Sequence, residues 1–327
     1  MKHRNFQIIF IQLFAFIFAL LIQGCSTGEK TDTITVATLR GPSAIGMIKM
    51  IEDPPDIYGR KPSFVINNEP IKTVPLISQG KVDFAILPSN LAAVLYNQGV
   101  DYQLAAIPVF GTLYLFGTDS TIHTWQDVKG KTIYSMGKGL TPDVILRYLL
   151  QKNDIDPEID VTIDYSFPSH IELAHAVASG HADLAVISEP LVSMVIAKNP
   201  DIIAIFDLNK EWEKSTKGEI PLAQTALLVR KSFAQENPRS VRKFLEYYEE
   251  SELWINDNYL EGAAYIVKHN VLPDTSIALA SIPKCNIRFA RAIDIKPSID
   301  EYFTIFYNFN PEIIGGKVPD EGFYFKE

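Results

Sequence analysis

The stretch ISQGKVDFAILP, residues 77–88, is matched by VASGHADLAVIS, residues 177–188, one hundred residues further along the chain. In both stretches a glycine follows a helical pattern, an aspartate comes three residues later, and an apolar run then ends in a polar turn. Glycine ends a helix in the left-handed conformation without a Cβ penalty, and such an apolar run is typical of a strand buried on both faces. The match favours two related α/β units. Chance recurrence of a common helix-to-strand junction is the alternative.

The same alternation of strand-like and helical patterns extends outward from both stretches. One series covers residues 34–117, and a second series covers residues 131–206. This rhythm predicts mainly parallel sheets with helices on both faces. A further strand-like run, residues 222–229, follows a polar stretch and precedes a strongly periodic helix. If these late elements return to the first unit, the chain crosses between the units twice, near residues 108–117 and 206–222.

The N-terminus has the pattern of an export signal. Lys2 and Arg4 precede an apolar run, residues 6–22, which matches the charged and hydrophobic regions of a signal peptide. A permanent membrane span is the weaker interpretation, because the run ends at once in Gln-Gly-Cys without polar flanking residues of the usual kind. We therefore expect residues 1–24 to be a signal peptide and the mature chain to be extracytoplasmic, in the periplasm or at the cell surface.

The end of the apolar run resembles the bacterial lipobox. In Ile22-Gln23-Gly24-Cys25 an aliphatic residue stands three positions before the cysteine and a small residue directly before it. The resemblance implies that Cys25 becomes the new N-terminus and carries acyl chains such as palmitate, which hold the protein at a bilayer. Residues 25–33 lack apolar periodicity beyond the cysteine, so we expect them to be a tether.

Composition excludes several classes of function. Apart from Cys25 the chain has one cysteine, Cys285, so we expect neither an internal disulfide nor a thiolate metal cluster. The net charge is −9, and −11 without the two basic residues of the signal, which opposes nucleic-acid binding. His170, His175 and His181 are five and six residues apart, off the spacing that places side chains on one helix face. We therefore predict no metal and no cofactor.

Several short motifs follow one another along the chain, and their order is more informative than any one of them. They are the opening Leu39-Arg40-Gly41-Pro42-Ser43, Gly80-x-x-Asp83-x-Ala85, the stretch Trp125–Lys131, Gly180-x-x-Asp183-x-Ala185 with Glu189-Pro190, and the late strand Ala226–Val229 before a long helix. In this order, over nearly all of Thr33–Lys268, the chain resembles the substrate-binding proteins of ATP-driven (ABC) importers of the nitrate, sulfonate, taurine and thiamine-precursor type.

This resemblance implies a fold and a function. The fold is α/β, of the periplasmic-binding-protein type II, with two doubly wound lobes joined by two crossing segments and a ligand cleft between them. We expect residues 34–110 and 218–327 to form lobe 1 and residues 111–217 to form lobe 2. The implied function is that of a monomeric binding protein, not an enzyme, which captures a small polar or anionic organic molecule and delivers it to an ABC permease and its ATPase. The alternatives are an enzyme on the same fold, of the menaquinone-pathway or pyrimidine-synthesis type, and a ligand-sensing module of a membrane receptor.

Residues directly after strands of the first lobe are candidate ligand contacts. Arg40, Gly41 and Ser43 lie between a strand and a helix, where a guanidinium and free backbone N–H groups bind anions. Ser89 and Asn90 follow the next apolar strand and supply a hydroxyl and an amide. Simple helix capping by Ser43, with Arg40 in solvent, and turn formation by the second pair are the alternatives.

The second lobe and the first crossing add further candidates. Gly139 and Thr141 belong to a glycine loop in which Thr141 is expected to cap the next helix, and Thr112 lies on the crossing segment. Glu189 follows the apolar strand of the repeat and would favour an amine, a ring edge or hydroxyls, so the ligand could be zwitterionic or a hydrogen-bonding heterocycle. The alternative for Glu189 is a cap of the helix that follows.

Overall fold

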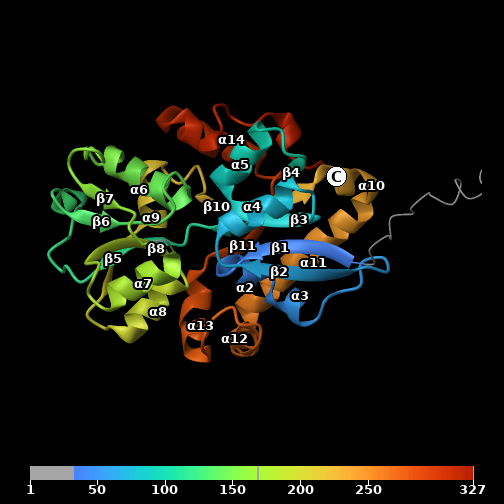
Figure 1. Ribbon diagram of the computed structural model, residues 1–327, viewed down its shortest axis with the longest axis horizontal. Helices are drawn as coiled ribbons and strands as arrows, with labels where there is room; N and C mark the ends of the chain where they lie inside the picture. Colours follow the sequence, from blue (N-terminus) through green and yellow to red (C-terminus); the bar gives the residue numbers. More distant parts are fainter. Residues whose placement is uncertain (1–32, 168, 327) are drawn as a thin grey trace, which may run out of the picture. The chain divides into compact units, whose positions relative to one another are not determined.

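A computed structural model describes residues 33–167 and 169–326 of the chain, shown as a ribbon in Figure 1. The predicted signal peptide, Cys25 and all of the predicted tether except residue 33 lie outside these residues. From Thr33 onward the chain forms one compact unit. No helix in this described part has the length and apolar content needed to cross a bilayer.

Within the described residues, the first sheet has six strands. Their order is β11 (Ile287–Arg291), β4 (Tyr102–Phe110), β10 (Ala223–Arg230), β3 (Phe84–Pro88), β1 (Thr33–Leu39) and β2 (Lys61–Asn67). β1 pairs in parallel with β2 and β3, whereas β10 is antiparallel to β3 and β4. The late strand β10 thus enters the sheet beside β3, which confirms that the chain returns to the first unit.

The second sheet has five strands in the described part of the chain. Their order is β7 (Thr162–Asp164), β6 (Thr132–Tyr134), β8 (Leu184–Ser188), β5 (Leu113–Gly117) and β9 (Ile203–Asp207). β6 is parallel to β7 and β8, and β5 is antiparallel to β8 and β9. Two α/β sheets joined by two crossings are the predicted fold class, which is confirmed.

The sequence repeat marks equivalent places in the two sheets. β3 and β8 each lie between a parallel and an antiparallel neighbour, and each follows a glycine with positive φ, Gly80 at +62° and Gly180 at +74°. The aspartates differ in role. Asp83 accepts hydrogen bonds from the backbone N–H and hydroxyl of Thr35 at 2.8 and 2.9 Å and pairs with Arg230 at 2.6 Å, whereas Asp183 is exposed.

Helices cover both sheets (Figure 1). We call the six-stranded sheet and its helices the first lobe; these helices are α2 (Pro42–Gly46), α3 (Ile48–Glu52), α4 (Pro70–Ser78), α5 (Ser89–Asn97), α10 (Lys231–Glu236), α11 (Pro238–Asp257), α12 (Tyr259–Lys268), α13 (Thr275–Ser281) and α14 (Lys296–Phe309). The five-stranded sheet and its helices are the second lobe; these helices are α6 (Thr141–Lys152), α7 (His170–Ala178), α8 (Leu191–Lys198) and α9 (Leu208–Ser215). Short 3-10 turns are η2 (Trp125–Val128), η3 (Ile282–Lys284), η4 (Pro311–Ile314) and η5 (Glu321–Phe323).

Helix α9 was not expected, because its sequence is a polar stretch. The helix starts at Asp207, whose carboxylate accepts hydrogen bonds from the backbone N–H groups of Asn209 and Lys210 at 3.0 and 3.2 Å. Only one narrow face is apolar, and it buries Leu208 and Trp212 completely. Two large buried side chains are enough to fix a polar helix on the core, since packing rather than propensity supplies most helical stability.

The two crossing segments lie side by side. The first is Gly111-Thr112, between β4 and β5, and the second precedes β10. The backbone N–H of Gly111 donates to the Leu222 carbonyl at 3.0 Å, and the N–H and hydroxyl of Thr112 donate to Oε1 of Gln224 at 2.7 and 3.0 Å. A Cβ at Gly111 would lie 2.1 Å from Oδ1 of Asn209, so only glycine fits where the crossings meet.

Helix α11 buries an acidic side chain behind the first sheet. Glu252 is 2% exposed, and neither carboxylate oxygen has a hydrogen-bond partner among the described residues. Burial raises the pKa of this carboxyl well above its usual range, because the charged form loses its hydration. Folding therefore favours proton uptake at Glu252.

This proton uptake predicts a pH-dependent stability. Because the pKa of Glu252 is higher in the folded than in the unfolded chain, its protonation contributes to the free energy of unfolding. This contribution is fully present below the unfolded pKa of about 4.3 and is lost as pH rises toward the folded pKa. Glutamine does not titrate, so we expect Glu252→Gln to keep its stability as pH rises. The difference between its melting temperature and that of wild type should therefore increase from pH 5 to pH 8. The exposed Glu250→Gln on the same helix is the matched control. A Glu252→Gln difference that stays constant with pH would contradict the assignment.

Candidate ligand-binding site

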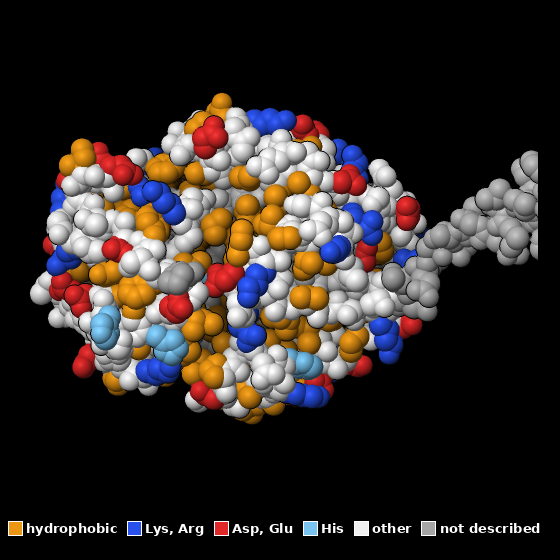
Figure 2. Space-filling view, in the orientation of Figure 1, with side chains coloured by type: hydrophobic (Ala, Val, Ile, Leu, Met, Phe, Trp, Pro, Cys, Tyr) orange, Lys and Arg blue, Asp and Glu red, His pale blue; other side chains and the backbone are white. Residues whose placement is uncertain are grey.

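A pocket of about 670 Å³ lies where strand ends of both sheets meet. Its walls come from the loops after β1, β2 and β3 of the first lobe, from the segments around α6, α7 and α8 of the second lobe, and from β10 and the loop between α12 and α13. Figure 2 shows acidic and basic side chains close together in the hollowed middle of one face. Open α/β sheets bind ligands at this edge, so the pocket is the candidate site.

The lining combines a large apolar surface with a few polar groups. The apolar side chains are Leu39, Pro42, Pro70, Pro88, Met136, Leu140, Pro142, Ile171, Pro190, Leu191, Met194, Val267, Val271, Leu272 and Pro273. The polar and charged ones are Arg40, Ser43, Asn68, Glu69, His170, His175, Ser188, Glu189, Lys198, Gln224, Thr225 and Asn270. Such a pocket suits a small organic molecule that has an apolar body and a few polar groups.

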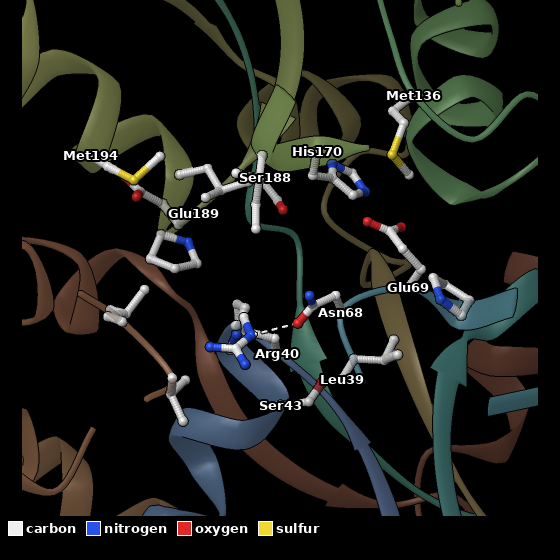
Figure 3. A pocket seen from close by; sticks show the side chains of 18 of the residues that line it. Leu39, Arg40, Ser43, Asn68, Glu69, Met136, His170, Ser188, Glu189 and Met194 are labelled. Carbon is white, nitrogen blue, oxygen red and sulfur yellow. Dashed lines mark hydrogen bonds between the residues drawn. The ribbon is translucent and has the colours of Figure 1, made fainter. Parts of the chain in front are cut away.

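Arg40 is fixed at the first-lobe wall. Its Nε donates to Oδ1 of Asn68 at 2.7 Å, the bond drawn in Figure 3, and a terminal nitrogen donates to the carbonyl of Asn270. Asn270 follows α12 in the left-handed conformation, with φ of +55°. Two acceptors from distant parts of the chain therefore orient the guanidinium, which lines the pocket and remains exposed.

The loop after β1 depends on glycine. Gly41 has φ of +116°, a conformation that other residues rarely adopt, and a Cβ there would lie 3.6 Å from Cδ of Pro190 in the second lobe. Ser43 is buried and lines the pocket, but α2 begins after Gly41 without a side-chain cap. The expectation that Ser43 caps this helix is wrong, because the residue lies inside the first turn.

Glu189 both caps α8 and lines the pocket. It is 1% exposed, and its two oxygens accept hydrogen bonds from the backbone N–H and the hydroxyl of Ser193, each at 3.0 Å. Burial raises the pKa of the carboxyl, while the hydrogen bonds from Ser193 act in the opposite direction. Pro190 is the cap residue of α8, but the Glu189 carboxylate accepts a backbone N–H of the first helical turn, as the capping interpretation expected, and also borders the site.

Sequence reasoning missed several polar pocket residues, among them Glu69 and His170. Figure 3 shows both side chains directed into the pocket, Glu69 from the loop after β2 and His170 from the start of α7. Desolvation lowers the pKa of His170 to about 4, so the ring is neutral at pH 7, and its buried Nδ1 has no hydrogen-bond partner in the described part of the chain. Desolvation raises the pKa of Glu69, with Glu172 adding to the rise and Lys72 opposing it. The after-strand rule could have found Glu69.

Five of the predicted site residues do not line the pocket: Ser89, Asn90, Thr112, Gly139 and Thr141. Their polar atoms bond to protein groups instead. The Ser89 hydroxyl lies 3.1 Å from the Tyr302 hydroxyl, Thr112 bonds to Gln224, and Asn90 bonds to Gly139 and Thr141.

Thr141 was expected to cap α6, which is wrong: Leu140 is the cap residue, and Thr141 is the first residue of the helix. Arg40, Gly41, Ser43 and Glu189 are brought together at the pocket.

The cap at Glu189 generates a prediction about stability without ligand. Glu189→Ala removes the acceptors of the Ser193 N–H and hydroxyl, so we expect the free energy of unfolding to fall by about 1 kcal/mol. Glu189→Gln keeps one carbonyl acceptor and should lose less. Urea unfolding of the three proteins checks this order. Equal stability of Glu189→Ala and wild type would mean that the cap contributes nothing.

A bilobal α/β chain with a pocket at facing strand ends is typical of extracytoplasmic solute-binding proteins. Residues 59–258 match the family model described as "ABC transporter, phosphonate, periplasmic substrate-binding protein". The chain belongs to this family. The family and the structural neighbour SsuA named below are transport binding proteins and not enzymes, in agreement with the sequence-based expectation.

Relatives and solved structures agree with this assignment. A crystal structure of an ABC transporter from Parabacteroides distasonis is 27% identical, with a TM-score of 0.77 over 90% of this chain and 99% of that one. The aliphatic sulphonate binding protein SsuA of Escherichia coli has the same fold at 15% identity, with a TM-score of 0.72 over 90% and 92%. The putative binding protein YtlA of Bacillus subtilis is 28% identical over 203 residues, which span 59% of this chain and 56% of YtlA.

Proposed function

We propose that this chain captures a small organic solute in the interlobe pocket and delivers it to an ABC permease and its ATPase. The observation that carries the proposal is the pocket of about 670 Å³, which is lined by strand ends of both sheets in a member of this binding-protein family. A site made by two lobes is well suited to transport, because separating the lobes would expose the solute to the permease. We further propose the lobe boundaries expected from the sequence, residues 34–110 with 218–327 and residues 111–217.

The proposed solute has an oxyanion at one end. Arg40 and the backbone N–H groups around Gly41 and Ser43 form a donor group at the first-lobe wall, which suits an oxyanion. The family description names phosphonate, and the structural neighbour SsuA is an aliphatic sulphonate binding protein. Both groups are small oxyanions with a carbon substituent, for which the apolar walls provide a matching surface.

The other charged groups of the pocket favour a solute that is not anionic throughout. Glu69 and Glu189 would repel a second anionic group. These groups accept hydrogen bonds from an amine or hydroxyl. We therefore propose a zwitterionic or hydroxylated organic phosphonate or sulfonate as the solute.

The proposed role includes a lipid anchor. We propose that residues 1–24 are removed, that Cys25 carries the acyl chains, and that residues 25–33 tether a monomeric binding unit to a bacterial membrane outside the cytoplasm, in the periplasm or at the cell surface. The lipobox-like sequence supports this proposal, and a chain that stays at the membrane meets its permease at a high effective concentration.

Arg40 provides a test of the binding proposal. A solute at about 100 times its Kd adds roughly 2.7 kcal/mol to stability, so we expect a raised melting temperature with 2-aminoethylphosphonate or taurine, and a smaller rise with methylphosphonate, which has no amine. Arg40→Ala should lose this shift, because the oxyanion loses its guanidinium partner. Arg239→Ala, which removes an exposed arginine on α11, is the control and should retain it. A shift that persists in Arg40→Ala would place the oxyanion elsewhere.

The anchor is tested separately. We expect the full chain, expressed in a bacterium fed with labelled palmitate, to be labelled and to sediment with membranes. Cys25→Ser should lose the label, because no acyl acceptor remains at the lipobox, whereas Cys285→Ser should keep it. A label that remains on Cys25→Ser would contradict the assignment of the lipidation site.

A further inference from the structure

Asn90 joins three separate parts of the chain through its side-chain amide. Nδ2 donates to the carbonyl of Gly139 at 2.7 Å and to that of Ile313 at 3.2 Å, and Oδ1 accepts from the hydroxyl of Thr141 at 3.0 Å. Asn90 is on α5 of the first lobe, whereas Gly139 and Thr141 belong to the second lobe. The residue is 1% exposed, so water does not compete for these hydrogen bonds in this arrangement.

The loop that Asn90 holds is also part of the pocket wall. Residues 139–142 alternate between two roles. Gly139 and Thr141 form hydrogen bonds with Asn90, whereas Leu140 and Pro142 line the pocket. Gly139 has φ of +77°, and its N–H is held by the carboxylate of Asp143 at 2.7 Å. Moving this loop away from α5 would therefore break the Asn90 hydrogen bonds and remove one wall of the pocket together.

The C-terminal segment reinforces the same side of the molecule. Helix α14 lies beside α5 in Figure 1, and its Tyr302 contacts Ser89 of α5 on one side and Trp212 of α9 on the other, with ring centroids 5.6 Å apart. Phe309 at the end of α14 contacts Tyr148 of α6. The apolar core consequently runs from the first lobe through α14 into the second lobe, which leaves the Asn90 amide as a buried polar bridge within an apolar surrounding.

We infer that Asn90 is a positioning residue that holds the two lobes in the arrangement in which the pocket walls face each other. It acts through the loop of Gly139 and Thr141 and does not line the pocket. Buried hydrogen bonds have partners only in this arrangement, so their loss shifts the population toward separated lobes. The inference rests on the proposed function in one respect: holding the pocket closed has a use only because the pocket binds a solute.

The test measures lobe separation without any solute. Spin labels are attached to a keto amino acid placed at Lys61 on β2 and at Gln151 on α6, two exposed positions in different lobes, and pulsed electron resonance gives the distance distribution in the full chain. We expect Asn90→Ala to raise the population of longer distances by about fivefold, the factor expected for the loss of about one net hydrogen bond. Because no solute is added, the result does not depend on whether the proposed solute class is correct.

Asn97→Ala is the matched control. Asn97 is also on α5, and its Nδ2 donates to the carbonyls of Ile314 and Lys317 at 2.6 and 2.7 Å, two acceptors that belong to the C-terminal segment and not to the second lobe. A purely structural loosening would change both variants alike, whereas the inference requires a long-distance population in Asn90→Ala alone. Thr141→Val removes one of the Asn90 hydrogen bonds and keeps the test open if Asn90→Ala does not fold. An unchanged distribution in the folded variants, or equal broadening in Asn97→Ala, would overturn the inference.

Discussion

The hydrogen bonds between the two crossing segments are the constraint on which the site depends. Thr112 donates from its backbone N–H and its hydroxyl to Oε1 of Gln224, and Gly111 donates to the carbonyl of Leu222. These bonds fix the point where the chain leaves the first sheet against the point where it returns. The strand ends of both sheets are thereby directed to one pocket, and Gln224 itself lines it. Thr112, predicted to contact ligand, instead orients a pocket residue.

Much of the fold could be predicted from the sequence because local and global signals agree. The Gly-x-x-Asp repeat marks β3 and β8, and the late strand-like run at residues 222–229 nearly coincides with β10. The residues after 268 lacked a clear alternation, so β11 and α14 were not foreseen. α14 is fixed by aromatic contacts to both lobes, such as that of Tyr302 with Trp212, and contacts between such distant parts of a chain leave no local pattern.

The site was predicted less completely, for a geometric reason. Residues directly after strands were expected to face the ligand, and Arg40, Gly41, Ser43 and Glu189 do line the pocket. The same rule chose Asn90, which lies after β3 but bonds to the loop of the second lobe. Sequence position specifies the end of a sheet at which a residue lies, but not whether its side chain meets a ligand or the opposite lobe. His170 was considered only as a metal ligand, and its place at the pocket follows from the start of α7.

The electrostatics of the pocket set the chemistry of its solute. Arg40 is oriented by Asn68 and Asn270, while Glu69 and Glu189 are carboxyls whose pKa burial raises. Arg40 on the first-lobe wall and Glu189 on the second-lobe wall, in a pocket with many apolar side chains, favour a molecule with an anionic end and a hydrogen-bond-donating end. Native mass spectrometry of the full chain, purified from a bacterium in mild detergent and mixed with 2-aminoethylphosphonate, methylphosphonate and taurine, tests this most directly. The account predicts a one-to-one complex with 2-aminoethylphosphonate or taurine that is absent in Arg40→Ala, and binding of methylphosphonate alone, or an uncomplexed chain in every mixture, would contradict it.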